Sequence, residues 1–105
     1  MKSKINPTSI DVMKRNAIRA EAMLKLLANA KRLMILCHLI KGEKSVSELS
    51  DLVDLSHSAI SQHLSKMRDH NLVDSKKHGK MVYYRISSLE VEAILSTLYL
   101  IYCKN

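Results

Sequence analysis

The sequence is poor in the residues that build tight turns and in large aromatic side chains. It has two glycines and one proline in 105 residues, too few for a small β-sandwich or barrel with many turns, so helices should predominate. Phenylalanine and tryptophan are missing, so the core must be built from aliphatic side chains, six methionines and four tyrosines. The hydrophobic content of 47% suffices for such a core and argues against a disordered chain.

Long apolar segments are also missing. No uninterrupted apolar run approaches the length of about 18 residues that a membrane-spanning helix needs. The first ten residues, MKSKINPTSI, lack the apolar segment of a secretory signal peptide, so we expect a cytoplasmic protein. In that reducing compartment the two cysteines, Cys37 and Cys103, should be thiols rather than a structural disulfide. The length fits a single domain over residues 1–105.

The residue patterns of common enzyme sites are missing too, whereas positive charge is abundant. The chain has no glycine-rich phosphate loop and no catalytic triad, and it is too small to enclose a substrate cleft. We therefore expect neither an enzyme nor a bound cofactor. Seventeen Lys and Arg against ten Asp and Glu give a net charge of +7. This excess favours a polyanionic partner, with nucleic acid ahead of an anionic membrane.

Helical patterns lie at both ends of the chain. Apolar residues at helical spacing predict a long first helix over residues 9–27, with Pro7-Thr8-Ser9 as its start. A second helix is predicted over Lys31–Ile40, with Cys37 on its apolar face. Ser87 and Glu90 have the spacing of a capping box, so a last helix should start there and run to about Cys103.

Two short helices are predicted in the middle of the chain. Ser45 and Glu48 form a second capping-box pattern, which opens a helix that ends near Val53. After a brief turn at Asp54-Leu55, Ser56 is the predicted N-cap of a helix running to about His70. A pair of short helices joined by a tight turn is typical of a helix-turn-helix.

Alternating apolar residues follow this pair. Asn71 tolerates the left-handed backbone of a helix stop. Residues 72–78 and 81–86 are then predicted strands, joined by the two-residue turn Gly79-Lys80. This register places Asp74 opposite Arg85, which is a favourable cross-strand pair. The predicted fold is mainly α with a small β-hairpin wing, in the order α-α-α-α-β-β-α.

Short polar and basic side chains gather in residues 56–85. A helix with short polar side chains fits the major groove of a DNA duplex, and hairpin lysines reach the phosphates beside it. A merely solvated surface would explain the basic residues, but not why Ser65 and its neighbours stand where Glu and Lys are usual. His63 either reaches phosphate or packs under the helix. The candidate DNA contacts are Ser56, His57, Ser58, Ser61, Gln62, His63, Lys66, Lys76, Lys77 and Lys80.

Three segments resemble one known family. LSHSAISQHLSKMRDHNLV at residues 55–73 and the basic hairpin ending in VYYRI at 82–86 are similar to the ArsR/SmtB winged helix-turn-helix repressors. LANAKRLMILCHL at 27–39 resembles the family's second helix. The resemblance extends over roughly residues 20–103. It implies a homodimer that binds an imperfect palindrome in double-stranded DNA, with the first and last helices as the interface. Both helices carry more apolar surface than a monomer can hide.

The metal ligands of that family are missing from the matching positions. The arsenic-type Cys-Val-Cys motif aligns with Ser45-Val46-Ser47, and residues 88–105 contain no Asp or His for the zinc-type site. Four histidines, at positions 57, 63, 70 and 78, lie in the DNA-facing half without metal-ligand spacing. We therefore expect no metal site.

The two cysteines resemble those of the family's persulfide-sensing subgroup. That resemblance implies that reactive sulfur links Cys37 and Cys103 through a disulfide or polysulfide bridge and that the DNA is then released. Taken alone, Cys37 also fits a small hydrophobic residue of the core. Cys103 falls on the more polar face of the last helix, with Glu92, Ser96 and Tyr99, where a sulfur donor has access. A polysulfide spans cysteines too far apart for a plain disulfide.

Two other functions share these residues. One is a transcriptional activator that displaces a nucleoid silencer, as one member of the same subgroup does. The other is a sensor of soft metals or oxidants, because Cu(I) or Hg(II) needs few thiolate ligands.

Overall fold

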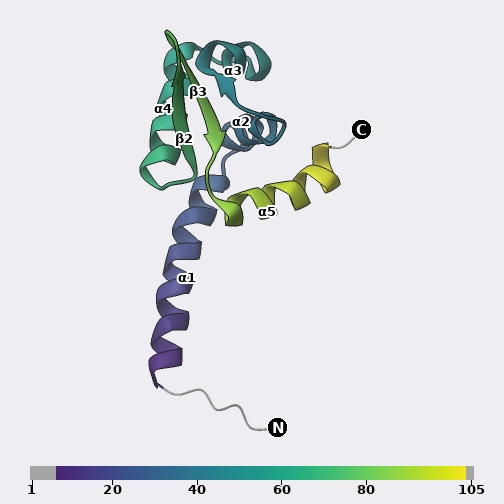
Figure 1. Cartoon of the computed structure of the whole chain (residues 1–105). Coiled ribbons are helices and arrows are strands. Elements are labelled where there is room, and N and C mark those ends of the chain that lie inside the picture. The colour runs from purple at the N-terminus through teal and green to yellow at the C-terminus, as the bar shows by residue number, and fades with distance from the viewer. Residues whose placement is uncertain (1–6, 104–105) are drawn as a thin grey trace.

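The computed structural model describes the backbone of residues 7–103 and the side chains of residues 9–102. The described part of the chain is mostly helical, with one small antiparallel sheet (Figure 1). The elements are α1 (Pro7–Leu27), α2 (Ala30–Ile40), β1 (Lys44–Ser45), α3 (Val46–Val53), α4 (His57–Asp69), β2 (Val73–His78), β3 (Met81–Ile86), α5 (Leu89–Leu98) and the π-helical turn η1 (Tyr99–Cys103). The predicted winged helix-turn-helix fold is confirmed.

The sheet has the strand order β1-β3-β2. Strands β2 and β3 form the predicted hairpin around Gly79-Lys80, and Asp74 pairs with Arg85 as expected. The two-residue strand β1 was not predicted. It pairs Lys44 with Tyr84 and Ser45 with Tyr83, and so attaches the start of α3 directly to the wing.

The core lies where α2, α3, α4 and α5 meet the sheet. Its fully buried side chains come from every one of these elements, and Tyr84 and Ile86 of β3 pack against them. Within α4, the buried residues Ile60, Leu64 and Met67 follow helical spacing and hold one face against the core. The opposite face of α4 is thereby turned to solvent.

Helix caps fix the helix-turn-helix. The Ser45 hydroxyl accepts the Glu48 N–H at 3.1 Å, and the Ser45 N–H donates to the Glu48 carboxylate at 2.9 Å, so this predicted capping box is present. Asp54 ends α3 in the left-handed region, with φ of 58°. The Ser56 hydroxyl then accepts the Ala59 N–H at 3.1 Å and caps α4 as predicted.

The predicted cap of the last helix is wrong by one residue. Ser88, not Ser87, is the N-cap of α5, and its hydroxyl accepts the Val91 N–H at 3.2 Å. Ser87 is held elsewhere, because its N–H donates to the Leu72 carbonyl and its hydroxyl donates to the Asn71 carbonyl. These two bonds connect the residue after β3 to the turn between α4 and β2, so α5 begins one residue later.

The last helix also ends differently from the prediction. Its α-helical backbone stops at Leu98, and residues 99–103 form a π turn. The α spacing that placed Cys103 on one polar face with Glu92 and Ser96 therefore ends before Cys103 is reached. Ser96 and Tyr99 are half-buried rather than open, and the Cys103 side chain lies outside the described residues.

Helix α1 extends away from the rest of the structure, and α5 projects from the body on a different side (Figure 1). The radius of gyration is 16.5 Å, whereas a compact domain of this length has about 13 Å. All described side chains of residues 9–22 are exposed, and α1 contributes only its end to the core through Leu26 and Leu27. The elongated shape leaves apolar surface uncovered on α1.

Candidate nucleic-acid interface

The exposed face of α4 carries the predicted polar residues. Ser58, Ser61, Gln62 and Ser65 are all exposed, as are His57 and Lys66. No described residue forms a hydrogen bond with the Gln62 amide, whereas the Ser58 hydroxyl lies 3.3 Å from the hydroxyl of Ser56. This face therefore offers donors and acceptors to a ligand along about three helical turns.

His63 lies at the edge of this face and is half-buried. Burial is the first cause that lowers its pKa below the usual value of 6.5, and the positive charges of Arg32 and Lys66 lower it further. Arg32 is held at the start of α2, where its Nε donates to the Leu26 carbonyl at 2.6 Å. The two predicted alternatives for His63 were contact with phosphate and packing under the helix. The side chain is partly packed and partly exposed, so the structure does not select one of them.

The wing presents basic side chains next to α4. Lys76, Lys77 and Lys80 are all exposed around the turn between β2 and β3. In Figure 1 the hairpin runs alongside α4, and the two elements are in contact through the start of β2. A groove-binding helix with a basic hairpin beside it is the arrangement that positions a protein on a duplex.

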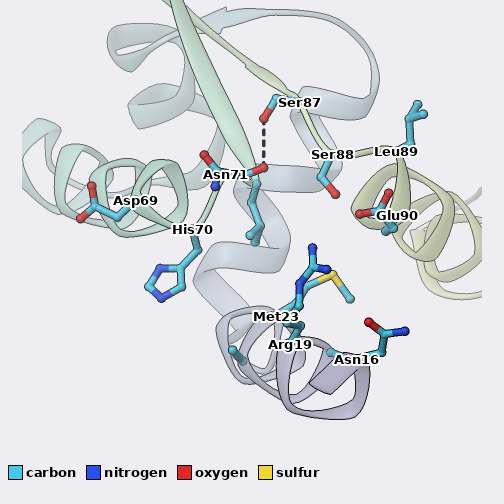
Figure 2. Close-up of a pocket in the computed structure, with 13 residues that line it drawn as sticks. Asn16, Arg19, Met23, Asp69, His70, Asn71, Ser87, Ser88, Leu89 and Glu90 are labelled. Carbon is cyan, nitrogen blue, oxygen red and sulfur yellow. Dashed lines mark hydrogen bonds between the residues drawn. The ribbon is translucent and has the colours of Figure 1, made fainter. Parts of the chain in front are cut away.

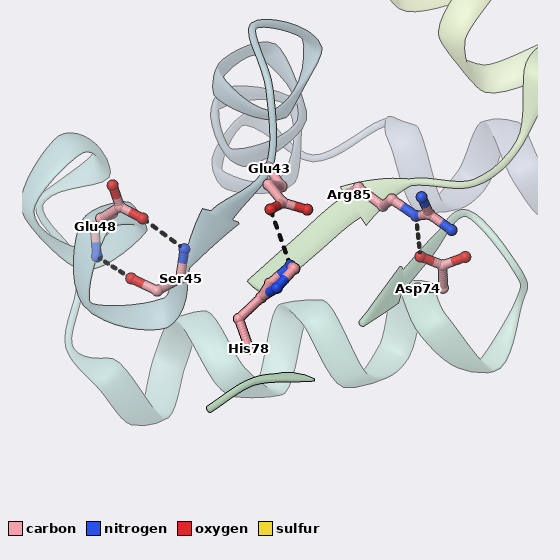
Figure 3. Close-up of polar contacts among 6 residues, drawn as sticks. All are labelled: Glu43, Ser45, Glu48, Asp74, His78 and Arg85. Carbon is pink, nitrogen blue, oxygen red and sulfur yellow. Dashed lines mark hydrogen bonds and ion pairs between the residues drawn. The ribbon is translucent and has the colours of Figure 1, made fainter. Parts of the chain in front are cut away.

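A polar network covers the outer face of the sheet. The Arg85 guanidinium donates to the Asp74 carboxylate at 2.9 Å, and Glu43 lies within 3.2 Å of the His78 imidazole (Figure 3). The hydrogen bond to Asp74 and the charge of Asp74 raise the pKa of Arg85, burial opposes them, and the charge of Glu43 adds the smallest upward contribution. The Glu43–His78 contact was not predicted, because nothing in the local sequence links these residues.

The cysteines lie on α2 and at the end of η1. Cys37 is half-buried on α2, and Cys103 is the last residue of η1. The end of α2 and the start of η1 are in contact, since the Lys41 ammonium lies 5.7 Å from the centre of the Tyr99 ring. Lys41 follows Cys37 by four residues and Tyr99 precedes Cys103 by four, so the contact is about one turn from each cysteine. Helices α2 and α5 also contact each other.

Positive charge is concentrated at the end of α2. Burial and then the charges of Lys41 and Lys44 lower the pKa of His38, the residue after Cys37.

A cleft of about 810 Å³ lies between α1, the end of α4 and the start of α5. Arg19 and Met23 reach into it from α1, opposite Asn71 and Ser88 (Figure 2). A second, shallower groove runs along α1 beside Leu24, and half of its lining residues are alanines. Both hollows border the uncovered part of α1.

Within the part of the chain that the structure describes, no three His, Cys, Asp or Glu side chains are grouped to hold a metal ion. None of the described helices is long and apolar enough to cross a membrane.

The fold and the exposed polar face of α4 are those of a winged helix-turn-helix regulator. Residues 29–75 match the family model described as bacterial regulatory protein, arsR family. The chain is 43% identical over 98 residues to the transcriptional activator HlyU of Vibrio cholerae, covering 93% of this chain and 91% of that protein. The chain belongs to the ArsR family and is therefore a DNA-binding transcriptional regulator and not an enzyme.

Two further relatives agree with this assignment. A biofilm growth-associated repressor of Agrobacterium fabrum is 32% identical over 99 residues, which cover 94% of this chain and 85% of the repressor. The solved structure of reduced HlyU from Vibrio cholerae superposes with a TM-score of 0.84 at 44% identity, covering 88% of this chain and 97% of that one. The relatives thus include both an activator and a repressor.

Proposed function

We propose that this chain is a homodimeric repressor that binds an imperfect palindrome and releases it when reactive sulfur bridges Cys37 and Cys103. The observation that supports sulfur sensing by the two cysteines is the Lys41–Tyr99 contact. This contact joins the two cysteine-bearing segments about one helical turn from each cysteine. The DNA-binding half rests on the exposed polar face of α4 beside the basic wing.

On DNA, α4 enters the major groove and the wing lies against the backbone. Gln62 pairs with adenine through its amide, which is exposed and able to donate and accept at once. Ser56, His57, Ser58 and Ser61 surround it at the start of the helix. The lysines neutralise phosphates and supply affinity that does not depend on sequence; these are Lys66, Lys76, Lys77 and Lys80.

The second copy covers α1 and η1. Met13 and Ile18 of α1 are 61% and 65% exposed, and Ile101 and Tyr102 of η1 are 63% and 78% exposed. Large apolar side chains exposed in this number favour an interface. A two-fold axis through it presents two α4 helices to half-sites about one DNA turn apart.

The sulfur chemistry proceeds by thiol exchange with a low-molecular-weight persulfide. The Cys37 thiolate attacks the outer, sulfane sulfur of the persulfide, and the donor leaves as its own thiolate. The Cys103 thiolate then attacks the Cys37 sulfur of the new protein persulfide and expels hydrosulfide, which leaves a disulfide. The two protein thiols are oxidised, and the sulfane sulfur is reduced to hydrosulfide. One further round of transfer before closure inserts one extra sulfur and gives a trisulfide.

Bridging is coupled to DNA through α5 and η1. The bridge fixes η1 to α2, and η1 carries part of the proposed dimer surface, so the spacing of the two α4 helices changes. A loss of DNA affinity of about 100-fold corresponds to a coupling free energy of roughly 2.7 kcal/mol, which is usual for allostery.

A second candidate is an activator that displaces a nucleoid silencer, which the name of the Vibrio cholerae relative favours. Both functions use the same DNA-binding residues. Footprinting on genomic DNA, with and without a sulfide donor, separates them. A repressor protects sites that overlap promoters, whereas an activator of this kind protects sites inside silenced regions upstream.

The remaining alternative is a sensor of soft metals or of peroxide. Titration of the reduced protein with Cu(I), with peroxide and with glutathione persulfide, each followed by a DNA-binding measurement, tests it. The proposed function requires release by the persulfide. Release by Cu(I) or peroxide, with no effect of persulfide, would replace the sulfur proposal by this alternative.

A further inference from the structure

The outer face of the sheet carries a connection between the wing and the helix-turn-helix. Alternate residues of a strand share one face, so the register places Asp74 and His78 of β2 on the same face as Tyr83 and Arg85 of β3. The other face, with Val73 and Tyr84, packs on the core. The outer face is therefore free to hold polar contacts that orient the hairpin.

Glu43 is central to those contacts. It lies just before β1 and outside the hairpin, yet its carboxylate is 3.2 Å from the His78 Nε2 at the end of β2 (Figure 3). His78 also stands edge-on to the Tyr83 ring, with 5.4 Å between the ring centres. Tyr83 belongs to β3. The carboxylate contact and the ring contact at His78 thus connect Glu43 with both strands of the wing.

The Glu43–His78 contact connects two parts of the chain that have different roles. Glu43 is followed by Lys44-Ser45, which form β1, and Ser45 is the buried N-cap of α3. His78 immediately precedes the Gly79-Lys80 turn. The Glu43–His78 pair therefore links the tip of the wing to the first helix of the helix-turn-helix across β3.

We propose that Glu43 is a positioning residue for DNA binding, which holds His78 and thereby sets the wing lysines relative to α4. The inference rests on the proposed phosphate contacts of those lysines. The effect on DNA affinity that we expect from removing Glu43 is opposite to the effect expected from charge alone. A carboxylate near a DNA-binding surface repels phosphate, so its removal should raise affinity unless the carboxylate has a structural task.

The test compares Glu43→Gln with Asp51→Asn, an exposed acid of α3 that contacts no described wing residue. Both variants remove one negative charge. We expect Glu43→Gln to weaken binding to an operator duplex by about two- to fivefold, the range of exposed contacts of this kind, and to flatten its salt dependence. Asp51→Asn should leave affinity unchanged or raise it. If Glu43→Gln binds more tightly, as Asp51→Asn does, the proposal is wrong.

A second measurement is made without DNA. In Glu43→Gln, the amides of His78 and Met81 should exchange with solvent several-fold faster, with the buried amides of α4 unchanged. Adding His78→Gln to Glu43→Gln should change neither the affinity nor the exchange further, because the pair acts as one unit. Unchanged exchange in Glu43→Gln would contradict the proposal.

Lys80→Ala separates this inference from the proposed function. If Lys80→Ala leaves the salt dependence of DNA binding intact, the wing does not touch phosphate and that part of the proposed function fails. The exchange measurement still decides whether Glu43 holds the wing. A flatter salt dependence for Lys80→Ala but not for Glu43→Gln would refute the positioning role alone.

Discussion

Replacement of Gln62 by alanine tests the recognition role of α4. The Gln62 side chain is exposed, and no described residue hydrogen-bonds to its amide, so Gln62→Ala should leave the fold and its stability intact. A bidentate pair between an amide side chain and adenine contributes about 1–3 kcal/mol of discrimination. This free energy corresponds to about a 5- to 150-fold loss of affinity for each half-site.

A homodimer on a palindrome loses that contact twice. The two half-sites lie about 34 Å apart, far enough for the two losses to add. The total loss on a symmetric operator is therefore about 2–6 kcal/mol, with the lower part of the range expected where one half-site is imperfect. Random DNA offers no aligned adenine, so its affinity should hardly change.

The assay is fluorescence anisotropy of a labelled operator duplex and of a scrambled duplex, both at one salt concentration. Ser47→Ala is the control, because Ser47 is exposed on α3, off the α4 face, and is not among the predicted contacts. It should bind both duplexes like the unsubstituted protein. Equal losses on both duplexes for Gln62→Ala would refute base recognition by this residue.

Three further predictions concern the wing, the helix caps and the half-buried histidines His38 and His63. Lys80→Ala should reduce the slope of log affinity against log salt by about 0.9 for each wing that contacts phosphate, and an unchanged slope would exclude that contact. Ser45→Ala should lower the free energy of unfolding, measured in urea, by about 1–2 kcal/mol. The loss should be larger than for Ser56→Ala, because Ser45 is 3% exposed and Ser56 is exposed to solvent. A larger loss for Ser56→Ala would contradict the proposed effect of burial on the caps. The pKa values of His38 and His63 are lowered in the folded state, so below about pH 6.5 the unfolded chain binds more protons and the urea midpoint should fall as the pH falls. The double variant His38→Gln/His63→Gln should show a weaker pH dependence, and the same dependence as the unsubstituted protein would assign it to other groups.

Local patterns predicted most of the fold. The Ser45–Glu48 capping box and the Ser56 cap each depend on residues within three positions, and both are present. The hairpin register followed from one charge pair, Asp74 with Arg85, which the structure contains at 2.9 Å. Such features can be predicted from the sequence because the spacing of the residues along the chain determines which of them interact.

The features that sequence patterns missed depend on contacts between distant segments. Strand β1 has two residues, too few to show an alternating pattern, and it exists because β3 lies beside it. The sequence predicted Ser87 as the cap of α5, but the bonds of Ser87 to Leu72 and Asn71 hold it elsewhere, and Ser88 is the cap.

The same limit applies to the candidate site. The exposed polar residues of α4 were predictable from helical spacing, whereas the Glu43–His78 and Lys41–Tyr99 contacts join residues that no local pattern relates. The cysteine pair came from family resemblance. Its role as a sulfur sensor stays a prediction.

The release of DNA by a sulfur bridge between Cys37 and Cys103 is tested by measuring the operator affinity of the reduced protein before and after treatment with glutathione persulfide, with intact-mass analysis of the same sample. We expect a loss of affinity of about 100-fold, together with a mass that corresponds to an intramolecular disulfide or polysulfide. Cys37→Ser and Cys103→Ser should bind like the reduced protein and should not be released, because a bridge needs both ends. Release of Cys103→Ser by persulfide, or undiminished binding of the treated unsubstituted protein, would show that the bridge does not control DNA binding.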